Sequence, residues 1–244
     1  MILSIQTIPY FNLSLAFIPV VIVIVLLWKW KLNFKSATYA VFRMLVQLLL
    51  IGFVLAYIFK ADESLIVMAV LMVMLISSSW IALGNVKISR KKLYLKTLLS
   101  ILIGGGSVLI LITQLVLDLE TWFMPSYVIP LAGMIFANAM NGISLAGERL
   151  ESEMERGGNY NESRRIALKA SLIPITNSLL AVGLVSLPGM MTGQILSGVS
   201  PFIAARYQIM VMCMIFGSVG ISSATFLVLI KDEMLKINQE KTDQ

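Results

Sequence analysis

Residues 171–198 read SLIPITNSLLAVGLVSLPGMMTGQILSG and carry the main clue to the fold. No charged residue occurs between Lys169 and Arg206, so the stretch can enter lipid. A straight helix of this length would be roughly 42 Å long, whereas the hydrocarbon core of a bilayer is about 30 Å thick. The stretch also contains residues that bend helices or carry amides, namely Pro174, Asn177, Pro188, Gln194 and four glycines.

Such a helix is more than a membrane anchor, which needs little beyond Leu, Val and Ile. Broken helices with polar groups are tolerated in a membrane where protein buries them or where they line a watery path. The stretch therefore indicates a transport protein. The alternative is a tilted helix that serves only packing.

Composition places the rest of the chain in the membrane as well. Of its 244 residues, 58% are hydrophobic and 13% are charged, against about a quarter charged in a soluble domain. Uncharged runs of spanning length recur, which predicts an all-α, polytopic integral membrane protein of the cell membrane. The first run lacks a basic n-region, so we expect it to stay as a span. The seven predicted spans are 12–30, 37–59, 64–84, 95–117, 124–147, 171–198 and 207–230.

The distribution of Lys and Arg predicts the orientation. Sixteen of the 19 basic residues fall in alternate connecting segments, two fall in the others, and Arg43 lies within a span. Under the positive-inside rule this places the N-terminus outside and the C-terminus inside. The net charge of +6 thus reflects membrane topology, and we expect no nucleic-acid partner. The predicted inner segments are 28–36, 85–96, 148–170 and 231–244.

The connecting segments leave no room for a second globular domain. All are short except the inner loop 148–170 and the polar tail. We therefore predict one transmembrane domain over 1–230 and a cytoplasmic tail over 231–244.

The chain lacks the residues of most catalytic and metal sites. It has no histidine, its 13 acidic residues all lie outside the predicted spans, and Cys213 is its only cysteine. Ion-coupled carriers usually need an intramembrane carboxylate or histidine, and no phosphate-binding loop of the G-x-x-x-x-G-K-[ST] type occurs. We expect no enzyme, no cofactor bound by this chain and no permanent metal site. Energy for uphill transport would come from a partner.

Amide side chains are the candidates for a translocation path. Asn138 and Asn141 share a face of the fifth span, and Asn177 enters the sixth at a similar depth. They either line an inward-facing vestibule or hydrogen-bond to one another as structural glue. In the second span, Arg43 and Gln47 are four residues apart on one face. Arg43 either snorkels to the surface or offers its charge inside the bundle.

The break in the sixth span completes the predicted path. Pro188 and Gly189 are expected to form a bend above the vestibule, with Gln194 beyond it. Met190 and Met191 follow the bend and are the best candidates for transient contacts with a soft metal. Methionine is also a common apolar filler.

The inner loop 148–170 predicts a helical elbow. ERLESEMER can extend the fifth span, Gly157 and Gly158 would end that helix, and Asn159 with Glu162 fit the N-cap of the next one. A charged elbow between the two most polar spans suits docking of a partner protein. The predicted docking residues are Glu148, Arg149, Glu151, Arg156, Arg164 and Arg165, with 85–96 as a secondary surface.

Several long strings resemble one known family. They are NAMNGISLA (138–146), VGLVSLPGMMTGQIL (182–196) and RYQI (206–209), with FRMLVQLLLIG (42–52) matching more weakly. The chain is similar over its whole length to the FetB/YbbM family, permease subunits of ABC transporters linked to iron export, with plant relatives linked to aluminium tolerance. One departure is the loop ERGGNYNESRR (155–165), shorter than is usual in the family.

The resemblance implies a homodimeric permease with two separate ATPase subunits that hold ATP and magnesium. It implies export of iron or of another metal or small solute. The alternative function is a self-contained channel or facilitator, in which the broken sixth span forms a pore without ATP.

Overall fold

The computed structural model describes residues 8–58, 63–86 and 88–242, and for 54–58 and 237–242 only the backbone. Within these ranges every regular element is a helix, which confirms the predicted all-α class. The chain divides into two compact units, described separately below. The smaller unit is Met1–Ala61 with Leu196–Gly198, and the larger is Asp62–Ile195 with Val199–Gln244. The prediction of a single domain over 1–230 stays a prediction.

The smaller unit consists of the first two predicted spans. They are formed by α1 (Tyr10–Leu15) with α2 (Ile18–Lys29), and by α3 (Phe34–Ile58). Lys31 turns the chain with φ of 57°, and Asn33 Oδ1 accepts a hydrogen bond of 3.2 Å from the amide of Ser36 in the first turn of α3. Residue 59, the end of the second predicted span, lies outside the described residues.

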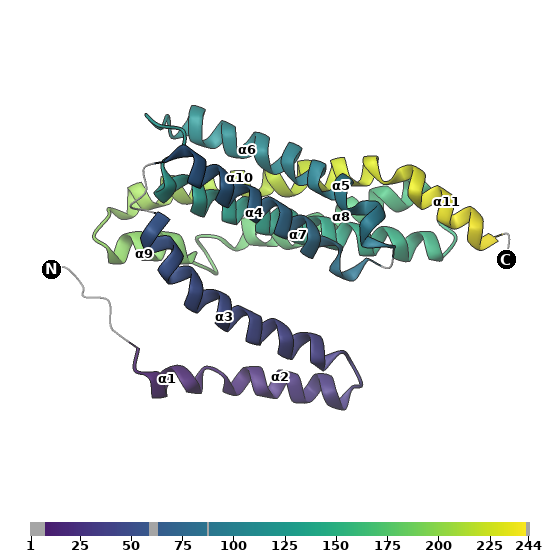
Figure 1. Cartoon of the computed structure of the whole chain (residues 1–244), viewed down its shortest axis with the longest axis horizontal. Helices are drawn as coiled ribbons and strands as arrows, with labels where there is room; N and C mark the ends of the chain where they lie inside the picture. The colour runs from purple at the N-terminus through teal and green to yellow at the C-terminus, as the bar shows by residue number, and fades with distance from the viewer. Residues whose placement is uncertain (1–7, 59–62, 87, 243–244) are drawn as a thin grey trace. The chain divides into compact units, whose positions relative to one another are not determined.

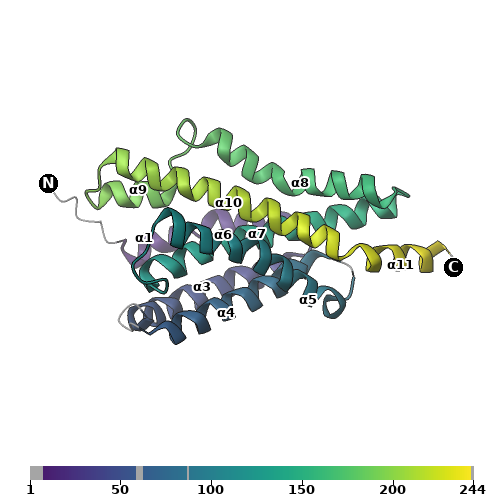
Figure 2. The same cartoon turned by 90° about the horizontal axis from the view of Figure 1, so that it is seen from above.

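The larger unit is a bundle of long helices that run roughly along one another (Figures 1 and 2). Two π-helical segments, η2 and η3, interrupt the fourth predicted span around α6. The elements are α4 (Ser64–Ala82), η1 (Leu83–Asn85), α5 (Arg90–Ile101), η2 (Leu102–Gly106), α6 (Ser107–Ile110), η3 (Leu111–Val116), α7 (Pro125–Glu155), α8 (Tyr160–Ala181), α9 (Gly189–Leu196), α10 (Pro201–Leu229) and α11 (Lys231–Thr242).

Six helices of the described part are long and apolar enough to cross a membrane, and they match six of the seven predicted spans. The predicted span 171–198 is not one of them, so seven helices are not confirmed. It is built from the end of α8, an irregular segment 182–188 and the short α9. The basic residues at the start of α8 and the break at its end leave no apolar helix of spanning length. The N-out, C-in orientation stays a prediction.

The irregular segment satisfies its own backbone locally. The amides of Leu184, Val185 and Ser186 donate to the carbonyl oxygen of Ala181, and the amide of Gly183 donates to that of Ser186 at 3.0 Å. Gly183 has φ of 83°, a conformation that costs a residue with a Cβ atom free energy. Non-helical backbone inside a membrane needs such internal partners. The break is therefore an ordered turn whose hydrogen bonds come from residues 181–186.

Helix α10 lies at the centre of the larger unit, where it packs against α5, η2, α7 and α8. Its buried face carries Met214, Ser218, Ser222 and Phe226. A Cβ atom on Gly104 would lie 2.4 Å from the backbone nitrogen of Ser222. The missing side chain therefore lets η2 and α10 approach backbone to backbone, as small residues allow in membrane bundles.

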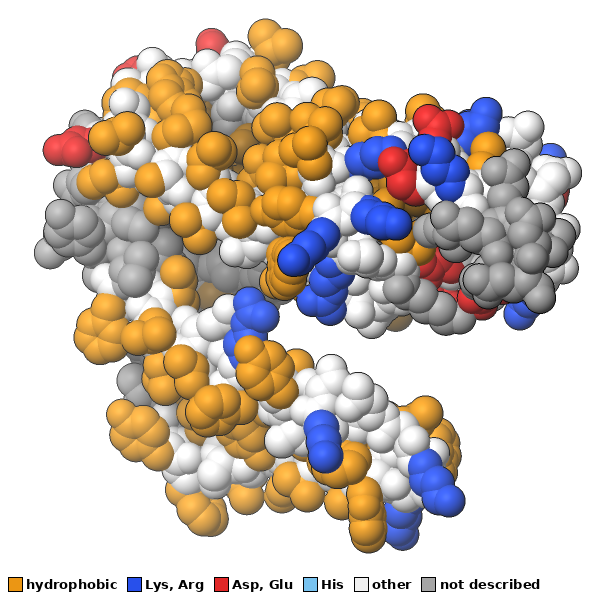
Figure 3. Space-filling view, turned by 45° about the vertical axis from the view of Figure 1, so that its right-hand side comes forward, with side chains coloured by type: hydrophobic (Ala, Val, Ile, Leu, Met, Phe, Trp, Pro, Cys, Tyr) orange, Lys and Arg blue, Asp and Glu red, His pale blue; other side chains and the backbone are white. Residues whose placement is uncertain are grey.

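The surface of the larger unit separates apolar from charged side chains. Hydrophobic side chains cover most of its visible face, and charged ones gather mainly at the end that carries α11 (Figure 3). An apolar belt with a charged end is typical of a helix bundle that sits in a bilayer. Together with the six apolar helices, it identifies a multi-pass membrane protein.

Substituting Gly104→Ala tests the close approach at Ser222. The added methyl would overlap backbone, so we expect destabilisation of about 1–3 kcal/mol, measured as a lower midpoint of thermal unfolding in detergent. Gly217→Ala is the matched control, because its nearest atom is Val108 Cγ2 at 3.8 Å, an ordinary contact. Equal midpoints for the two variants would contradict the close approach.

Candidate functional site

The break in the predicted sixth span lines a pocket of about 360 Å³, here called the central pocket. Its walls come from α7, α8, the irregular segment, α9 and α10. Among the predicted path residues, Asn138, Pro188, Gly189 and Met190 all line it. The other lining residues are Met134, Ile175, Ser178, Val182, Ser186, Gln208, Val211, Met212 and Ile215.

Gln208 is the most buried polar side chain of this pocket. It lies on the second turn of α10, 6% of its surface is exposed, and its Oε1 atom has no hydrogen-bond partner among the described residues. Burying an amide oxygen without a partner costs about 1–3 kcal/mol. A group that carries this cost while facing a pocket is suited to receive a hydrogen-bond donor or a cation from a transported solute.

Asn138 faces the same pocket from α7 and is half-buried. Its Nδ2 donates to the carbonyl oxygen of Met134, one turn earlier on the same helix, at 2.8 Å. This bond holds the amide against its own helix. The two predicted roles of the asparagines, lining of a vestibule and structural glue, stay predictions.

Two further pockets adjoin the central one and hold the remaining residues of the break. The first, of about 470 Å³, contains Gln194 and shares Met134 and Met190 with the central pocket. Gln194 Oε1 is also buried without a partner among the described residues. The second, of about 320 Å³, contains Met191 and shares Gln208. Gln194 and Met191, which come after the break in the sequence, thus place an amide and a thioether in the two pockets beside the central one.

Four predicted path residues lie elsewhere. Asn141 and Asn177 are exposed and line none of the three pockets. Asn177 follows Ile175 by two residues, about 200° around the helix, so it faces away from the pocket that Ile175 lines. Arg43 and Gln47 lie on α3 of the smaller unit, whereas all three pockets form within the larger one.

None of the described residues that line the central pocket is charged. The described residues also include no group of three or more His, Cys, Asp or Glu side chains that could hold a metal ion. Met134, Met190 and Met212 supply thioether sulfurs, which are weak, soft ligands. The pocket offers neutral donors and acceptors only, and the absence of a permanent metal site stays a prediction.

The loop 148–170 has the predicted form of an elbow. The amide of Gly158 donates to Glu153 and that of Gly157 to Met154, each at 3.1 Å, and Gly157 has φ of 85°. This pattern is a Schellman motif, which ends α7. Asn159 caps α8 by accepting a 3.0 Å bond from the amide of Glu162. The Gly-Gly stop and the N-cap are confirmed.

The predicted docking residues divide between the surface and the interior. Glu148 is exposed, and Arg156 and Arg165 are 67% and 79% exposed in ion pairs with acidic residues of the elbow. Arg149 and Arg164 are half-buried. Glu151 is only 7% exposed and accepts a hydrogen bond from the amide of Ile88 at 3.1 Å. Glu151 therefore holds a connecting segment inside the protein and is not part of the exposed surface.

Sequence reasoning missed Gln208. The residue lies within RYQI, which contributed only to the family resemblance. A signal was present, because Gln208 is the only amide side chain between residues 207 and 230.

In a comparison with known proteins, residues 10–163 and 158–235 of the chain match the family described as "Uncharacterised protein family (UPF0014)". The Escherichia coli protein named "Probable iron export permease protein FetB" is 34% identical over 228 residues, covering 87% of this chain and 86% of its own. Bacillus subtilis YjkA, a UPF0014 membrane protein, is 34% identical over 95% of this chain and 97% of its own.

A plant protein, ALUMINUM SENSITIVE 3 of Arabidopsis thaliana, is 32% identical over 86% of this chain and 81% of its own. No solved structure matches the chain. The predicted resemblance is thereby confirmed across bacteria and plants, and this multi-pass membrane protein belongs to the UPF0014 family.

Proposed function

We propose that this chain is the membrane-spanning permease subunit of an ABC transporter, driven by a separate ATPase subunit that holds ATP and magnesium. The observation that carries the proposal is the broken sixth crossing. It walls a pocket lined by Asn138 and by Gln208, whose buried amide oxygen has no partner among the described residues. The name of the FetB relative supports export of iron, or of another metal or small solute, as the activity.

The side chains that line the central pocket suit the passage of a solute better than its tight binding. A cation or a metal complex would meet amide oxygens and thioethers, with no carboxylate among the described lining residues to hold it tightly. Conduction requires binding that is favourable enough for entry and weak enough for release. A neutral pocket that is mostly apolar and carries a few polar groups meets both conditions.

Gln208→Leu tests the path. The loss of one neutral hydrogen bond is worth about 1 kcal/mol, so ATP-dependent movement of Fe²⁺ in proteoliposomes should fall about fivefold. Asn138→Leu should act in the same direction. The measurement is Fe²⁺ reaching a fluorescent chelator on the far side of the membrane, with the ATPase subunit present.

Gln114→Leu is the matched control. Gln114 is a glutamine of the larger unit that lines a different, largely apolar pocket, so its loss should leave transport near the wild-type rate. Normal transport by both Gln208→Leu and Asn138→Leu would show that these amides serve only packing. Transport at full rate without the ATPase would favour a self-contained facilitator.

The exposed charges of the elbow are the proposed docking surface for the ATPase. Arg156 and Arg165 are its most exposed arginines, so reversing both (Arg156→Glu with Arg165→Glu) should weaken co-purification of the ATPase at least fivefold. The unfolding midpoint should stay unchanged. Arg206→Glu, at the other end of α10, is the control. Undiminished co-purification and ATP-driven transport in the double variant would place docking elsewhere.

The exposed asparagines support a homodimer. An amide that faces lipid without a partner is costly, so Asn141 and Asn177 need protein cover. We assign that cover to a second copy of this chain. In a Cys213→Ser background, Asn177→Cys should form a dimer with a short bifunctional maleimide, whereas exposed Leu115→Cys should not. A cross-link within one chain to a cysteine placed in α3 would assign the cover to the smaller unit.

A further inference from the structure

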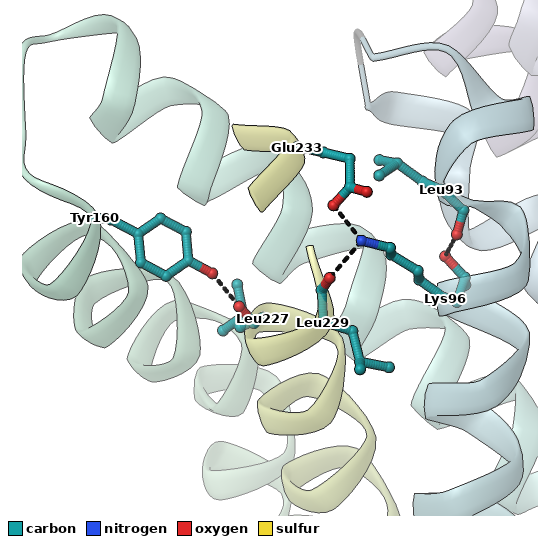
Figure 4. A network of polar contacts seen from close by, with 7 residues as sticks. Leu93, Lys96, Tyr160, Leu227, Leu229 and Glu233 are labelled. Carbon is teal, nitrogen blue, oxygen red and sulfur yellow. Dashed lines mark hydrogen bonds and ion pairs between the residues drawn. The ribbon is translucent and has the colours of Figure 1, made fainter. Parts of the chain in front are cut away.

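The cytoplasmic end predicted for α10 is held by side chains from two other helices. A helix ends with four carbonyl groups that lack partners within the helix. Helix α10 ends at Leu229, and two carbonyls of its last turn, those of Leu227 and Leu229, accept hydrogen bonds from Tyr160 and Lys96. Figure 4 shows both contacts.

Tyr160 is the first residue of α8 and joins the elbow to α10. Its hydroxyl donates to the carbonyl oxygen of Leu227, and its side chain is 5% exposed. Burial raises the pKa of Tyr160 to about 12, with the charge of Asp232 adding to the rise and that of Arg164 opposing it. The hydroxyl therefore stays protonated and can donate throughout the physiological range.

Lys96 makes the second contact, from α5. Its Nζ donates to the carbonyl oxygen of Leu229 at 2.7 Å and forms an ion pair with Glu233 on the first turn of α11. Burial opposes ionisation of Glu233, but the hydrogen bond and charge of Lys96, the group's own backbone amide and Lys236 together lower its pKa. Glu233 thus stays charged at neutral pH, and one ammonium group ties α5, α10 and α11 together.

We propose that Tyr160 and Lys96 form a clamp on the end of α10, in which Tyr160 makes α10 move with the elbow and Lys96 links that end to α5 and α11, so that both are positioning residues for transport. The proposal rests on the proposed function, in which the ATPase pushes on the elbow. The elbow is covalently joined only to α7 and α8. The clamp adds α10, the helix that carries Gln208.

The geometry gives the clamp a long reach. Gln208 and Leu227 are 19 residues apart on one continuous helix, which is about 28 Å. A rigid tilt of about 5° about the close contact at Ser222, which lies about 21 Å from Gln208, would therefore move Gln208 by about 1.8 Å, enough to break a hydrogen bond. The clamp can therefore act on the pocket without any contact between the ATPase and the pocket.

Tyr160→Phe tests the clamp with the smallest change, because the ring stays and only the hydroxyl is lost. Lys96→Met is the second variant, in case the first fails to fold. Tyr94→Phe is the matched control, since its hydroxyl also donates to a helix carbonyl, that of Ile76 at 3.4 Å, but holds α5 to α4. Cys213, the only cysteine, is exposed on α10 and reports on that helix.

The first measurement uses the permease alone. Amide hydrogen exchange at residues 226–230 should be at least threefold faster in Tyr160→Phe than in the wild type, and unchanged in Tyr94→Phe. Unchanged exchange in Tyr160→Phe would overturn the clamp whether or not an ATPase partner exists.

The second measurement uses the complex with the ATPase. ATP with vanadate should change the rate at which a membrane-permeant maleimide labels Cys213 in the wild type and in Tyr94→Phe. In Tyr160→Phe and Lys96→Met, this change should shrink at least threefold, with ATP hydrolysis retained and Fe²⁺ moved per ATP reduced.

The outcomes separate the two proposals. A wild-type response that both clamp variants retain overturns the clamp and leaves the proposed function standing. If the wild-type permease binds no ATPase, or if ATP does not change the labelling rate of Cys213 in the complex, the proposed function is overturned. The role of the clamp in transport is then overturned with it.

Discussion

Backbone groups that enter lipid must find their partners inside the protein, and this constraint explains where the chain is irregular. The predicted sixth span gives up helical geometry over residues 182–188. It can do so because the carbonyl oxygen of Ala181 accepts three amides and Gly183 adopts a positive φ. Six other helices of the described residues are long and apolar enough to cross a membrane. The irregular segment also lines the central pocket.

The end of α10 obeys the same constraint by another route. Its final carbonyls are satisfied by Tyr160 and Lys96, from elements 67 and 133 residues away in the sequence. A glycine cap or water would have satisfied them locally. Because these side chains come from distant parts of the sequence, they tie the end of α10 to the elbow and to α5. The same two hydrogen bonds therefore satisfy the backbone carbonyls and connect the helices.

Sequence periodicity predicted the parts of this molecule that local rules govern. The Gly157–Gly158 stop and the Asn159 cap depend on residues within one turn, so they could be read from the sequence. The pocket was predicted in part, because Pro188 and Gly189 mark the break. Gln208 was missed although it is the only amide side chain between residues 207 and 230. Its position in the pocket and the exposure of Asn177 depend on which face of each helix meets its neighbours. Glu151 was placed on the surface for the same reason.

The contact between Gly104 and Ser222 gives the clamped helix a natural pivot. Backbone meets backbone there, which restricts sideways movement of α10 at Ser222. Ser222 lies five residues, about 7.5 Å, from Leu227 and 14 residues, about 21 Å, from Gln208. A helix that tilts about Ser222 therefore moves Gln208 about three times as far as it moves Leu227. In the proposed clamp, a small displacement at the elbow would become a larger one at the pocket, so the glycine that permits tight packing would also set the leverage of the helix.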